Sequence, residues 1–379
     1  MKIVYCIAGT RHSGGMERVL ANKVNWLVAK GHEIHVVTTD QNGEPPFFKI
    51  DERIKCHDLE IGYEDNNGKS LFNKIINYPF KQILHRIKLK KLLFDLKPDI
   101  VVSMFCNDVS ILPSVKDGSV KILEVHFSRF KRLQYGRKGI WRFIDKFLSK
   151  QDKRIAKKYD KFVVLTEEDR KLWGNDMYNI KVIPNAHSFR LDIPASCDAN
   201  NVLAVGRFTY QKGFDRLIEA WGVIAPSFPE WKLTIVGGGE LFNDYKTQIK
   251  SIGIEDNVIL KEATSDIKSE YLNSSVYVMS SHYEGLPMAL LEAQASGLPI
   301  VSFACKCGPR DIVSDGVDGF LVDEGDIGSL AEKLMVLMKD KSLRKKFGKN
   351  AYHKSLEYTN EMIMQRWVEL FCDLKNNVS

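Results

Sequence analysis

Short apolar runs alternate along the whole chain with glycine-containing loops and helix-forming segments. The first run, Ile3–Ala8, is followed by a loop over 9–15, a helix over about 16–29 and a second apolar run over 33–39. Strand, helix and strand in this order form a βαβ unit, which implies a parallel sheet. The pattern predicts further strands over 99–104, 121–125, 162–166, 182–185, 257–260, 275–280 and 300–304, a strand with a glycine loop over 232–240, a strand, loop and helix within 201–215, and helices over 81–94, 288–296, 327–338 and 360–374.

The length and composition narrow the class of protein. A chain of 379 residues is too long for one ordinary core and suits two domains of about 150 to 200 residues. The seven cysteines are scattered, with no Cys-x-x-Cys spacing, which favours a reducing compartment. The first apolar run is too short for a signal peptide, and no run approaches the roughly 18 residues of a membrane span. We therefore expect a cytoplasmic protein.

The net charge of +7 is concentrated in one segment, residues 126–161. This segment holds thirteen Lys or Arg residues against three Asp, with aromatic residues between them. A basic amphipathic segment of this kind is typical of a surface that contacts anionic lipid headgroups. The interpretation that we favour is a peripheral position on the inner face of the cell membrane, with no nucleic-acid partner. Nucleic acid and a plain solvated helix face are the competing interpretations.

The stretch 280–299 carries the most specific signal, because it predicts a strand end, a loop, a short helix and a second loop. Pro287 suits the first position of the helix, and Gly297 suits the residue just after its end. Backbone N–H groups at the start of the helix favour an anion such as phosphate. Glu284 and Glu292 flank this start, about two helical turns apart, so they would contact different parts of one long ligand. The alternative is that both carboxylates are only solvated charges.

The sequence Glu284-Gly285-Leu286-Pro287, continuing through Glu292-Ala and Gly297-Leu-Pro299, resembles the paired-glutamate motif of the retaining glycosyltransferases of family 4. That family has the GT-B fold. The resemblance implies that Glu284 lies against the donor sugar and that the backbone of the three following residues approaches the diphosphate. Glu292 would bind the ribose hydroxyls.

A second match lies in Arg207 and Lys212, within the loop after the strand that opens the second half. In the family these two residues bind the donor diphosphate, and two fixed cations can neutralise the charge that grows on a leaving phosphate. The glycine loop within 232–240 is similar to the nucleotide-side loop of the family. Many members have Pro-Glu where this chain has Pro309-Arg310, so the role of Arg310 stays open.

Two further matches lie in the first half. Gly14-Gly15-Met-Glu-Arg resembles the Gly-Gly loop of the family, where missing side chains let the backbone approach phosphate and acceptor. A pair of glycines is often only a tight turn, but this pair joins the first strand to the first helix. His126 follows a predicted strand, at the place where the family carries an active-site histidine beside the donor sugar.

The resemblance covers most of the chain and implies two Rossmann-like domains facing across a cleft. The expected boundaries are an acceptor-side domain over 1–186, a linker over 187–200, a nucleotide-sugar domain over 201–358 and a helix over 359–379 that returns to the first domain. No Asp-x-Asp occurs in the sequence, so we expect no metal and no other cofactor.

These matches predict a retaining transfer of a hexose or N-acetylhexosamine from a nucleotide sugar, most plausibly a UDP-sugar. The basic segment suggests a lipid-linked saccharide acceptor, as in bacterial surface polysaccharide assembly. Two alternatives stay open. A nucleotide-sugar 2-epimerase can share the GT-B architecture, and a non-enzymatic basic protein that binds membranes or nucleic acid would explain the charge without the paired motifs.

Overall fold

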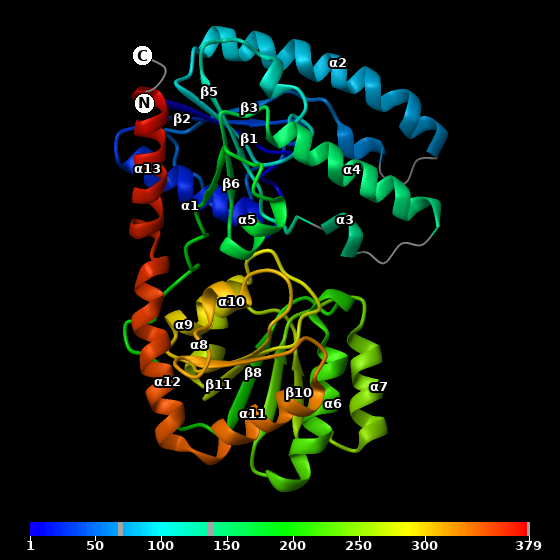
Figure 1. The fold of residues 1–379 in the computed structure, drawn as a ribbon, viewed down its shortest axis with the longest axis vertical. Helices are drawn as coiled ribbons and strands as arrows, with labels where there is room; N and C mark the ends of the chain where they lie inside the picture. Colours follow the sequence, from blue (N-terminus) through cyan, green and yellow to red (C-terminus); the bar gives the residue numbers. More distant parts are fainter. Residues whose placement is uncertain (67–70, 130, 135–138, 377–379) are drawn as a thin grey trace. The chain divides into compact units, whose positions relative to one another are not determined.

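The computed structural model describes residues 1–66, 71–129, 131–134 and 139–376, and it contains two units. The N-terminal unit consists of residues 1–165 and 170–183 together with the chain from Ile363 onward. The C-terminal unit consists of Thr166–Asp169 and Pro184–Met362. Each unit is built around its own parallel sheet (Figure 1). The prediction of two Rossmann-like α/β units is confirmed.

The sheet of the N-terminal unit has the strand order β3-β2-β1-β4-β5-β6-β7, and all neighbours are parallel. The inner strands are buried except at the first residues of β1, β2 and β6, which explains their near-continuous apolar sequences. The strands are β1 (Lys2–Cys6), β2 (Glu33–Thr38), β3 (Lys55–Asp58), β4 (Ile100–Ser103), β5 (Val120–Glu124), β6 (Lys161–Val164) and β7 (Ile180–Val182).

The sheet of the C-terminal unit has the strand order β10-β9-β8-β11-β12-β13, again with parallel neighbours. The order reverses at β8, so the loops after β8 and β11 leave the same edge of the sheet next to each other, as in other open α/β sheets. The strands are β8 (Asn201–Val205), β9 (Lys232–Val236), β10 (Val258–Lys261), β11 (Val276–Met279), β12 (Ile300–Phe303) and β13 (Gly319–Val322).

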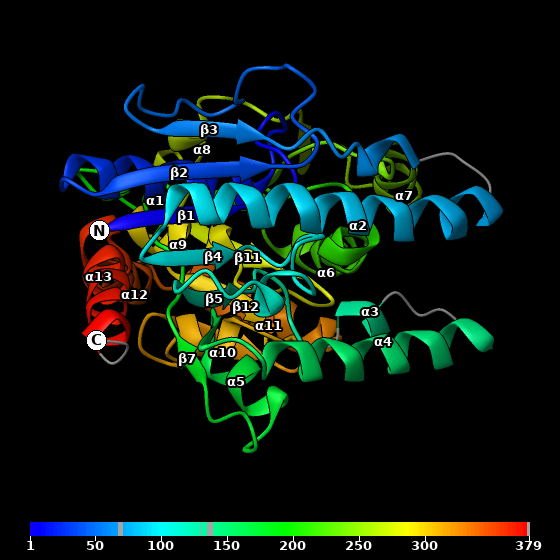
Figure 2. The same cartoon turned by 90° about the horizontal axis from the view of Figure 1, so that it is seen from above.

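The helices bury apolar stripes against these sheets, and Figures 1 and 2 show them around each sheet. The N-terminal unit contains α1 (Gly15–Ala29), η1 (Tyr63–Asn66), α2 (Leu71–Leu96), η2 (Leu112–Ser114), α3 (Lys131–Gln134), α4 (Ile140–Ala156) and the end of α5 (Glu167–Trp173). The C-terminal unit contains η3 (Tyr210–Lys212), α6 (Phe214–Ile224), η4 (Ala225–Ser227), α7 (Phe242–Ile252), α8 (Ile267–Leu272), α9 (Met288–Ala295), α10 (Pro309–Ile312), α11 (Ile327–Lys339), α12 (Lys341–Lys354) and η5 (Ser355–Tyr358).

The last helix, α13 (Asn360–Asn376), packs within the N-terminal unit from Ile363 onward. Its buried residues recur every three or four positions: Ile363, Met364, Trp367, Leu370 and Phe371. The Trp367 ring lies 3.9 Å from the Lys23 ammonium, and Lys375 lies 2.9 Å from a carboxylate oxygen of Asp99. A hydrophobic stripe and two cation contacts therefore hold this helix on the N-terminal unit.

The chain after β7 runs without regular structure and lies on the C-terminal unit. The backbone N–H of Leu191 donates to Ala295 O at 3.1 Å, and that of Ala195 donates to Ser296 O at 2.8 Å. These backbone bonds fix the segment to the end of α9, which belongs to the same unit.

The segment between β2 and β4 contains more structure than its sequence indicated. The sequence over 43–79 is mixed and rich in Asn and Gly, so that we assign it no function, and the pattern after it predicts a helix over 81–94. The structure has β3 and η1 in this segment, and α2 begins at Leu71 and contains Pro79. The strand was missed because β3 is a short edge strand with the polar sequence KCHD. Of the helices in the described ranges, none combines the length and hydrophobicity that crossing a membrane requires.

Candidate active site

Two neighbouring connections at the carboxyl edge of the C-terminal sheet carry the four charged residues predicted for the site. β8 leads into a loop with Arg207 and then into η3, which ends at Lys212. β11 leads into the loop with Glu284 and then into α9, which contains Glu292. Because β8 and β11 are hydrogen-bonded neighbours, these loops start side by side.

Glu284 and Lys212 contact each other directly. The Lys212 Nζ lies 2.8 Å from Glu284 Oε1, and the Ser281 hydroxyl donates to the same oxygen at 2.7 Å. The Gln211 amide donates to Glu284 Oε2 at 3.4 Å and to the backbone oxygen of Tyr283 at 3.1 Å. The Glu284 side chain is only 7% exposed, so these partners hold it in one orientation. The sequence missed Gln211 and Ser281, although both lie beside predicted residues.

The two loops are also joined by a glycine. Gly213 follows Lys212 and has φ +58°, and a Cβ built there would lie 2.4 Å from the backbone oxygen of Ser280. Position 213 therefore requires glycine, because glycine adopts the left-handed backbone readily and has no Cβ to clash with Ser280. In addition, Arg216 donates to the same Ser280 oxygen at 2.8 Å. The loop after β8 thus fits closely against the loop after β11.

Glu292 lies on α9, and its contacts differ from those of Glu284. The hydroxyl of Tyr271, a buried residue of α8, donates to Glu292 Oε2 at 3.1 Å. Burial, followed by the charge of Glu292, raises the pKa of Tyr271 well above its usual value, so this hydroxyl stays a donor. Glu292 is half-buried. The two glutamates therefore have separate partners, as expected if they contact different parts of a ligand.

The start of α9 differs by one residue from the prediction. Pro287 is the N-cap, with extended backbone, and the first helical residue is Met288. The missing N–H of proline is tolerated equally well at this position, so the prediction was wrong only in the register of the helix start. Gly297 lies just past the helix with φ +75°, as predicted. Gly285 and Leu286 lie in the loop before Pro287, and Leu286 is buried.

Arg207 and Arg310 lie in the same unit with different surroundings. The side chain of Arg207 is exposed at the carboxyl end of β8. Arg310, on α10, lies 3.6 Å from a carboxylate oxygen of Glu168. Burial raises the pKa of Glu168, and the charge of Arg310 opposes this shift. Arg310 is therefore part of an ion pair in the C-terminal unit.

A hollow of about 410 Å³ opens beside the predicted glycine loop. Its walls are formed by the loop after β9 and by the residues after β10: Gly237, Gly238, Gly239, Phe242, Glu262 and Ala263. Its volume lies in the range typical of small-molecule sites. The sequence indicated the glycines but missed Phe242, Glu262 and Ala263, which come from the next two elements. Among the residues that the structure describes, no cluster of three His, Cys, Asp or Glu side chains could hold a metal ion.

The predicted Gly-Gly pair begins α1 in the N-terminal unit. Gly14 is the N-cap with extended backbone, and Gly15 is the first helical residue. A Cβ added to Gly15 would have no neighbour within 4 Å, and its φ is not in the left-handed region. The protein's own packing therefore gives no reason for a glycine at position 15.

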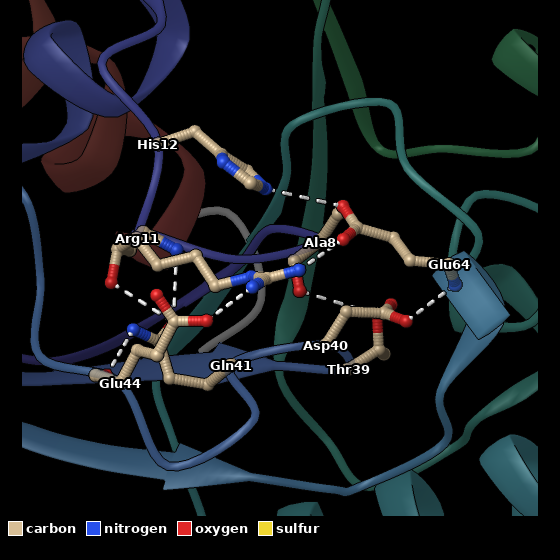
Figure 3. Close-up of polar contacts among 9 residues, drawn as sticks. Ala8, Arg11, His12, Thr39, Asp40, Gln41, Glu44 and Glu64 are labelled. Atoms are coloured by element: carbon tan, nitrogen blue, oxygen red, sulfur yellow. Dashed lines mark hydrogen bonds and ion pairs between the residues drawn. The ribbon is translucent and has the colours of Figure 1, made fainter. Parts of the chain in front are cut away.

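A polar cluster holds the loop that leads to this pair (Figure 3). The Arg11 guanidinium contacts the carboxylates of both Glu44 and Glu64, and His12 Nε2 lies 3.5 Å from Glu64 Oε1. The backbone N–H of Glu64 donates to Asp40 at 2.8 Å. Hydrogen bonds to both carboxylates raise the pKa of Arg11 further above its usual value. Segments after β1, β2 and β3 are thus tied together at one edge of the sheet.

His126 lies two residues after the end of β5 and is largely buried, with 6% of its side chain exposed. Its Nε2 lies 3.0 Å from Oε1 of Glu124, the last residue of β5. Glu124 is fully buried and also contacts Lys23 of α1. Burial alone would raise the pKa of Glu124, but the charges of Lys23 and His126 lower it to about 2. The prediction placed His126 correctly after a strand and missed its partner Glu124 and the Lys23 ammonium that contacts Glu124.

The basic segment 126–161 contains α3, α4 and the start of β6. Phe130, Tyr135, Arg137 and Lys138 of this segment lie outside the described residues. α4 exposes Phe143, Ile144 and Phe147, with exposed fractions of 73%, 38% and 62%. Basic residues of α4, among them Arg142, Lys146 and Lys150, are exposed as well. The structure thus shows an amphipathic basic helix with an uncovered apolar stripe.

Helix α2 has a similar uncovered stripe, which the sequence did not indicate. Phe80, Ile83 and Ile87 are exposed by 69%, 60% and 62% and follow each other at helical spacing. Figures 1 and 2 both show α2 and α4 projecting on the same side of the N-terminal unit. Isolated exposed apolar residues are common, but two such stripes on projecting helices point to a contact surface.

Models of two protein families match consecutive parts of the chain. The model of Glycosyltransferase Family 4 matches residues 13–188, which include Gly14, Gly15 and His126. The model of Glycosyl transferases group 1 matches residues 191–354, which include both glutamates. The two matches together span most of both units.

Related proteins match the chain over nearly its full length. The amylovoran biosynthesis glycosyltransferase AmsD of Erwinia amylovora is 36% identical over 389 residues, covering 97% of this chain and 99% of that protein. An α-1,4-N-acetyl-D-galactosaminyltransferase of Campylobacter jejuni, whose full name includes a saccharide on PP-undecaprenol, is 27% identical over 383 residues, covering 99% of each.

Solved glycosyltransferase structures share the fold. The crystal structure of TarM has a TM-score of 0.79 at 19% identity and covers 98% of each chain. A Staphylococcus aureus TarM mutant in complex with Fondaparinux, α-GlcNAc-glycerol and UDP has a TM-score of 0.77, again at 19% identity, and covers 98% of this chain and 99% of that one.

Proposed function

This chain belongs to the family 4 glycosyltransferases of GT-B fold, and from that premise we propose that it performs a retaining transfer of a hexose or N-acetylhexosamine from a UDP-sugar. The acceptor in this proposal is a lipid-linked saccharide in surface polysaccharide synthesis. The observation that carries it is the contact between Lys212 and the buried Glu284 at the carboxyl edge of the C-terminal sheet. A cation and a carboxylate held there suit the diphosphate and the sugar of one donor.

The donor would lie on the C-terminal unit. Lys212 and the exposed Arg207 supply two positive charges for the diphosphate, and the first N–H groups of α9 add a partial positive charge. Glu284 would hold sugar hydroxyls, and Glu292 with Tyr271 would hold the ribose. The hollow beside Gly237 has a size that suits a nucleotide base. A UDP complex of TarM, which shares the fold, is consistent with this donor class.

The cations also bear on the chemistry of the leaving group. As the bond from sugar to phosphate breaks, negative charge grows on the diphosphate, and fixed cations stabilise it without a metal. We therefore propose that transfer is metal-independent, with Arg207 and Lys212 in this role.

Retention would proceed by attack of the acceptor hydroxyl on the face of the sugar from which the diphosphate departs, with the departing phosphate accepting the proton. Glu284 is an unsuitable covalent nucleophile because Lys212, Ser281 and Gln211 all engage its carboxylate. A product with the same anomeric configuration as the donor would support retention. Mass spectrometric trapping of a sugar on a protein carboxylate would contradict front-face attack.

The acceptor side would lie on the N-terminal unit. Gly15 leaves open space at the start of α1, and His126 lies at the end of β5. The apolar and basic surface of α2 and α4 would rest on anionic lipid and bring the enzyme to a lipid-linked acceptor. The name of the Campylobacter jejuni relative, which includes PP-undecaprenol, supports this class of acceptor.

A thermal-shift screen with UDP-, GDP-, ADP- and TDP-sugars in the presence of EDTA tests the donor proposal. We expect one UDP-sugar to raise the Tm of the wild type and to have no effect on Glu292→Ala. Glu332→Ala removes an exposed carboxylate of α11 and should respond like the wild type. A selective response to another nucleotide would overturn the UDP assignment, and a response that appears only when magnesium replaces EDTA would overturn metal independence.

A further inference from the structure

A buried ion pair connects the two acceptor-side features of the N-terminal unit. Lys23 lies on α1, two turns after the Gly14–Gly15 start, and Glu124 ends β5 just before His126. Their side chains are 4% and 0% exposed, and the ammonium contacts Glu124 Oε1. The two residues are 101 positions apart in the sequence. α1 and the end of β5 are therefore fixed to each other by one charged contact.

The same carboxylate oxygen also meets the histidine. His126 Nε2 lies 3.0 Å from Glu124 Oε1, so a cation and an imidazole share one oxygen. On the other side of Lys23, the Trp367 ring of α13 lies 3.9 Å from the ammonium. Burial, followed by the charge of Glu124, raises the pKa of the buried Tyr5 of β1. Elements from both ends of the chain thus surround this group.

A buried ion pair stabilises a core no better than well-packed apolar side chains of similar volume often do. Removing two charges from water costs several kcal/mol per ion, and well-packed apolar residues would often stabilise the same site equally well. In some proteins buried charges are retained because they fix one geometry. Here the two charged side chains would fix the His126 ring, because His126 Nε2 contacts the Glu124 carboxylate.

We propose that Glu124 is a positioning residue for His126 and that Lys23 in turn fixes Glu124. The inference rests on the proposed function, in which His126 belongs to the acceptor side of the site. A negative carboxylate beside Nε2 favours a proton on that nitrogen, which leaves Nδ1 as the nitrogen that can accept a hydrogen bond from a sugar hydroxyl. Lys23 holds the carboxylate in place, and Trp367 makes α13 part of this support.

The test compares Glu124→Gln, His126→Ala and the variant with both changes. Glutamine keeps the shape of the side chain and removes its charge. The first readout is the ¹⁵N spectrum of the histidine rings, in which the His126 signals are identified by their loss in His126→Ala. The second is UDP release from a mixture of UDP-glucose, UDP-galactose and their N-acetylated amino-sugar counterparts, measured as slow hydrolysis in which water takes the sugar in place of the acceptor.

We expect Glu124→Gln to shift the balance between the two His126 tautomers and to slow UDP release about 10-fold or more. In the His126→Ala background the same substitution should cause no further loss, because Glu124 acts through His126. Equal losses in both backgrounds, or unchanged His126 signals, would overturn the inference.

Glu124→Gln leaves Lys23 buried without its carboxylate, so a second variant guards against unfolding. Lys23→Met with Glu124→Gln removes both charges, should fold, and should still alter the His126 signals and the rate. Wild-type signals and rate in this variant would overturn the inference. Asp117→Asn is the matched control, since it removes the partner of another buried lysine, Lys121, on β5. It should lower the Tm without changing the His126 signals.

Failure of the proposed function has a different signature. If none of these donors raises the Tm of the wild type in the thermal-shift screen, the proposed function fails, while the ¹⁵N spectra still decide whether Glu124 controls the His126 ring.

Discussion

Lys212 Nζ lies 2.8 Å from Glu284 Oε1 although the two residues are 72 positions apart in the sequence. The contact joins the loop after β8 to the loop after β11, and three further groups on these loops support it: the Ser281 hydroxyl, the Gln211 amide and the backbone of Gly213. The donor site proposed here is therefore organised before a ligand binds. Preorganised charge is the form in which a protein stabilises a developing anion most effectively.

Replacing Lys212 by methionine should slow transfer roughly 10²- to 10³-fold, the usual effect of removing one preorganised group that stabilises transition-state charge. Glu284 would also lose its cation, and an unsatisfied buried polar group costs about 1 to 3 kcal/mol of stability, a charged one more. Rates of UDP release and thermal unfolding measure the two effects separately. Lys261→Met breaks an exposed ion pair with Glu270 in the same unit and should change neither by much. Equal rates in the two variants would remove Lys212 from the mechanism.

Gly15→Ala should separate folding from substrate binding. A Cβ at Gly15 meets nothing within 4 Å, and alanine favours a helix over glycine by up to about 1 kcal/mol, so the Tm should stay or rise. The KM for the acceptor should rise if substrate occupies that space. Gly328→Ala makes the same exchange in the first turn of α11, with only Asp326 Oδ1 nearby at 3.7 Å, and should stabilise without affecting KM. An unchanged KM in Gly15→Ala would mean that the space beside Gly15 is not used.

His85 should make the N-terminal unit sensitive to acid. Its ring is buried against Tyr63, whose hydroxyl lies 3.1 Å from Nδ1, and burial lowers the pKa of His85 from 6.5 to about 4. The unfolded chain therefore takes up a proton at a higher pH than the folded chain. Stability from this residue is complete above about pH 6.5 and is lost as the pH falls towards 4, by at most about 3 kcal/mol.

Chemical denaturation at several pH values measures this loss. His85→Gln removes the titrating group and can still hydrogen-bond to Tyr63, so its free energy of unfolding should decline less between pH 6.5 and 4. Parallel curves for wild type and variant would show that another group causes the acid sensitivity.

Features of the fold and of the site that depend on short stretches of chain could be predicted from the sequence. Apolar runs located the strands, and the spacing of Glu284, Glu292 and Gly297 located a loop and a helix correctly to within one residue. The contacts between distant segments could not be predicted in this way. Tyr271 reaches Glu292 from another helix, and Lys23 reaches Glu124 across the sheet, because packing brings them together and local pattern does not record it.

The polar contacts of the first loop show the same limit. Arg11 is one basic residue in a glycine-containing loop, and nothing in its surroundings indicates that Glu44 and Glu64 will both bind it (Figure 3). Such clusters form where the ends of neighbouring parallel strands meet. The order of strands in the sheet must be known before they can be predicted.

The exposed stripes of α4 and α2 predict binding to anionic membranes. Phe143 and Phe147 are largely exposed beside basic residues, so Phe143→Ser with Phe147→Ser should greatly reduce sedimentation with vesicles that contain phosphatidylglycerol. Ile83→Ser with Ile87→Ser tests α2 in the same way. Raising the salt concentration should weaken binding of the wild type, because screening reduces the attraction of the basic residues.

Val223→Ser is the control for general loss of apolar surface, since this residue is 60% exposed on α6 of the C-terminal unit. It should sediment like the wild type. If the α2 variant binds normally and the α4 variant does not, the membrane surface is confined to the basic segment. Normal sedimentation of both variants would mean that neither stripe contacts lipid. The acceptor would then have to be sought among soluble saccharides. The proposed donor site would not change, because it lies on the C-terminal unit.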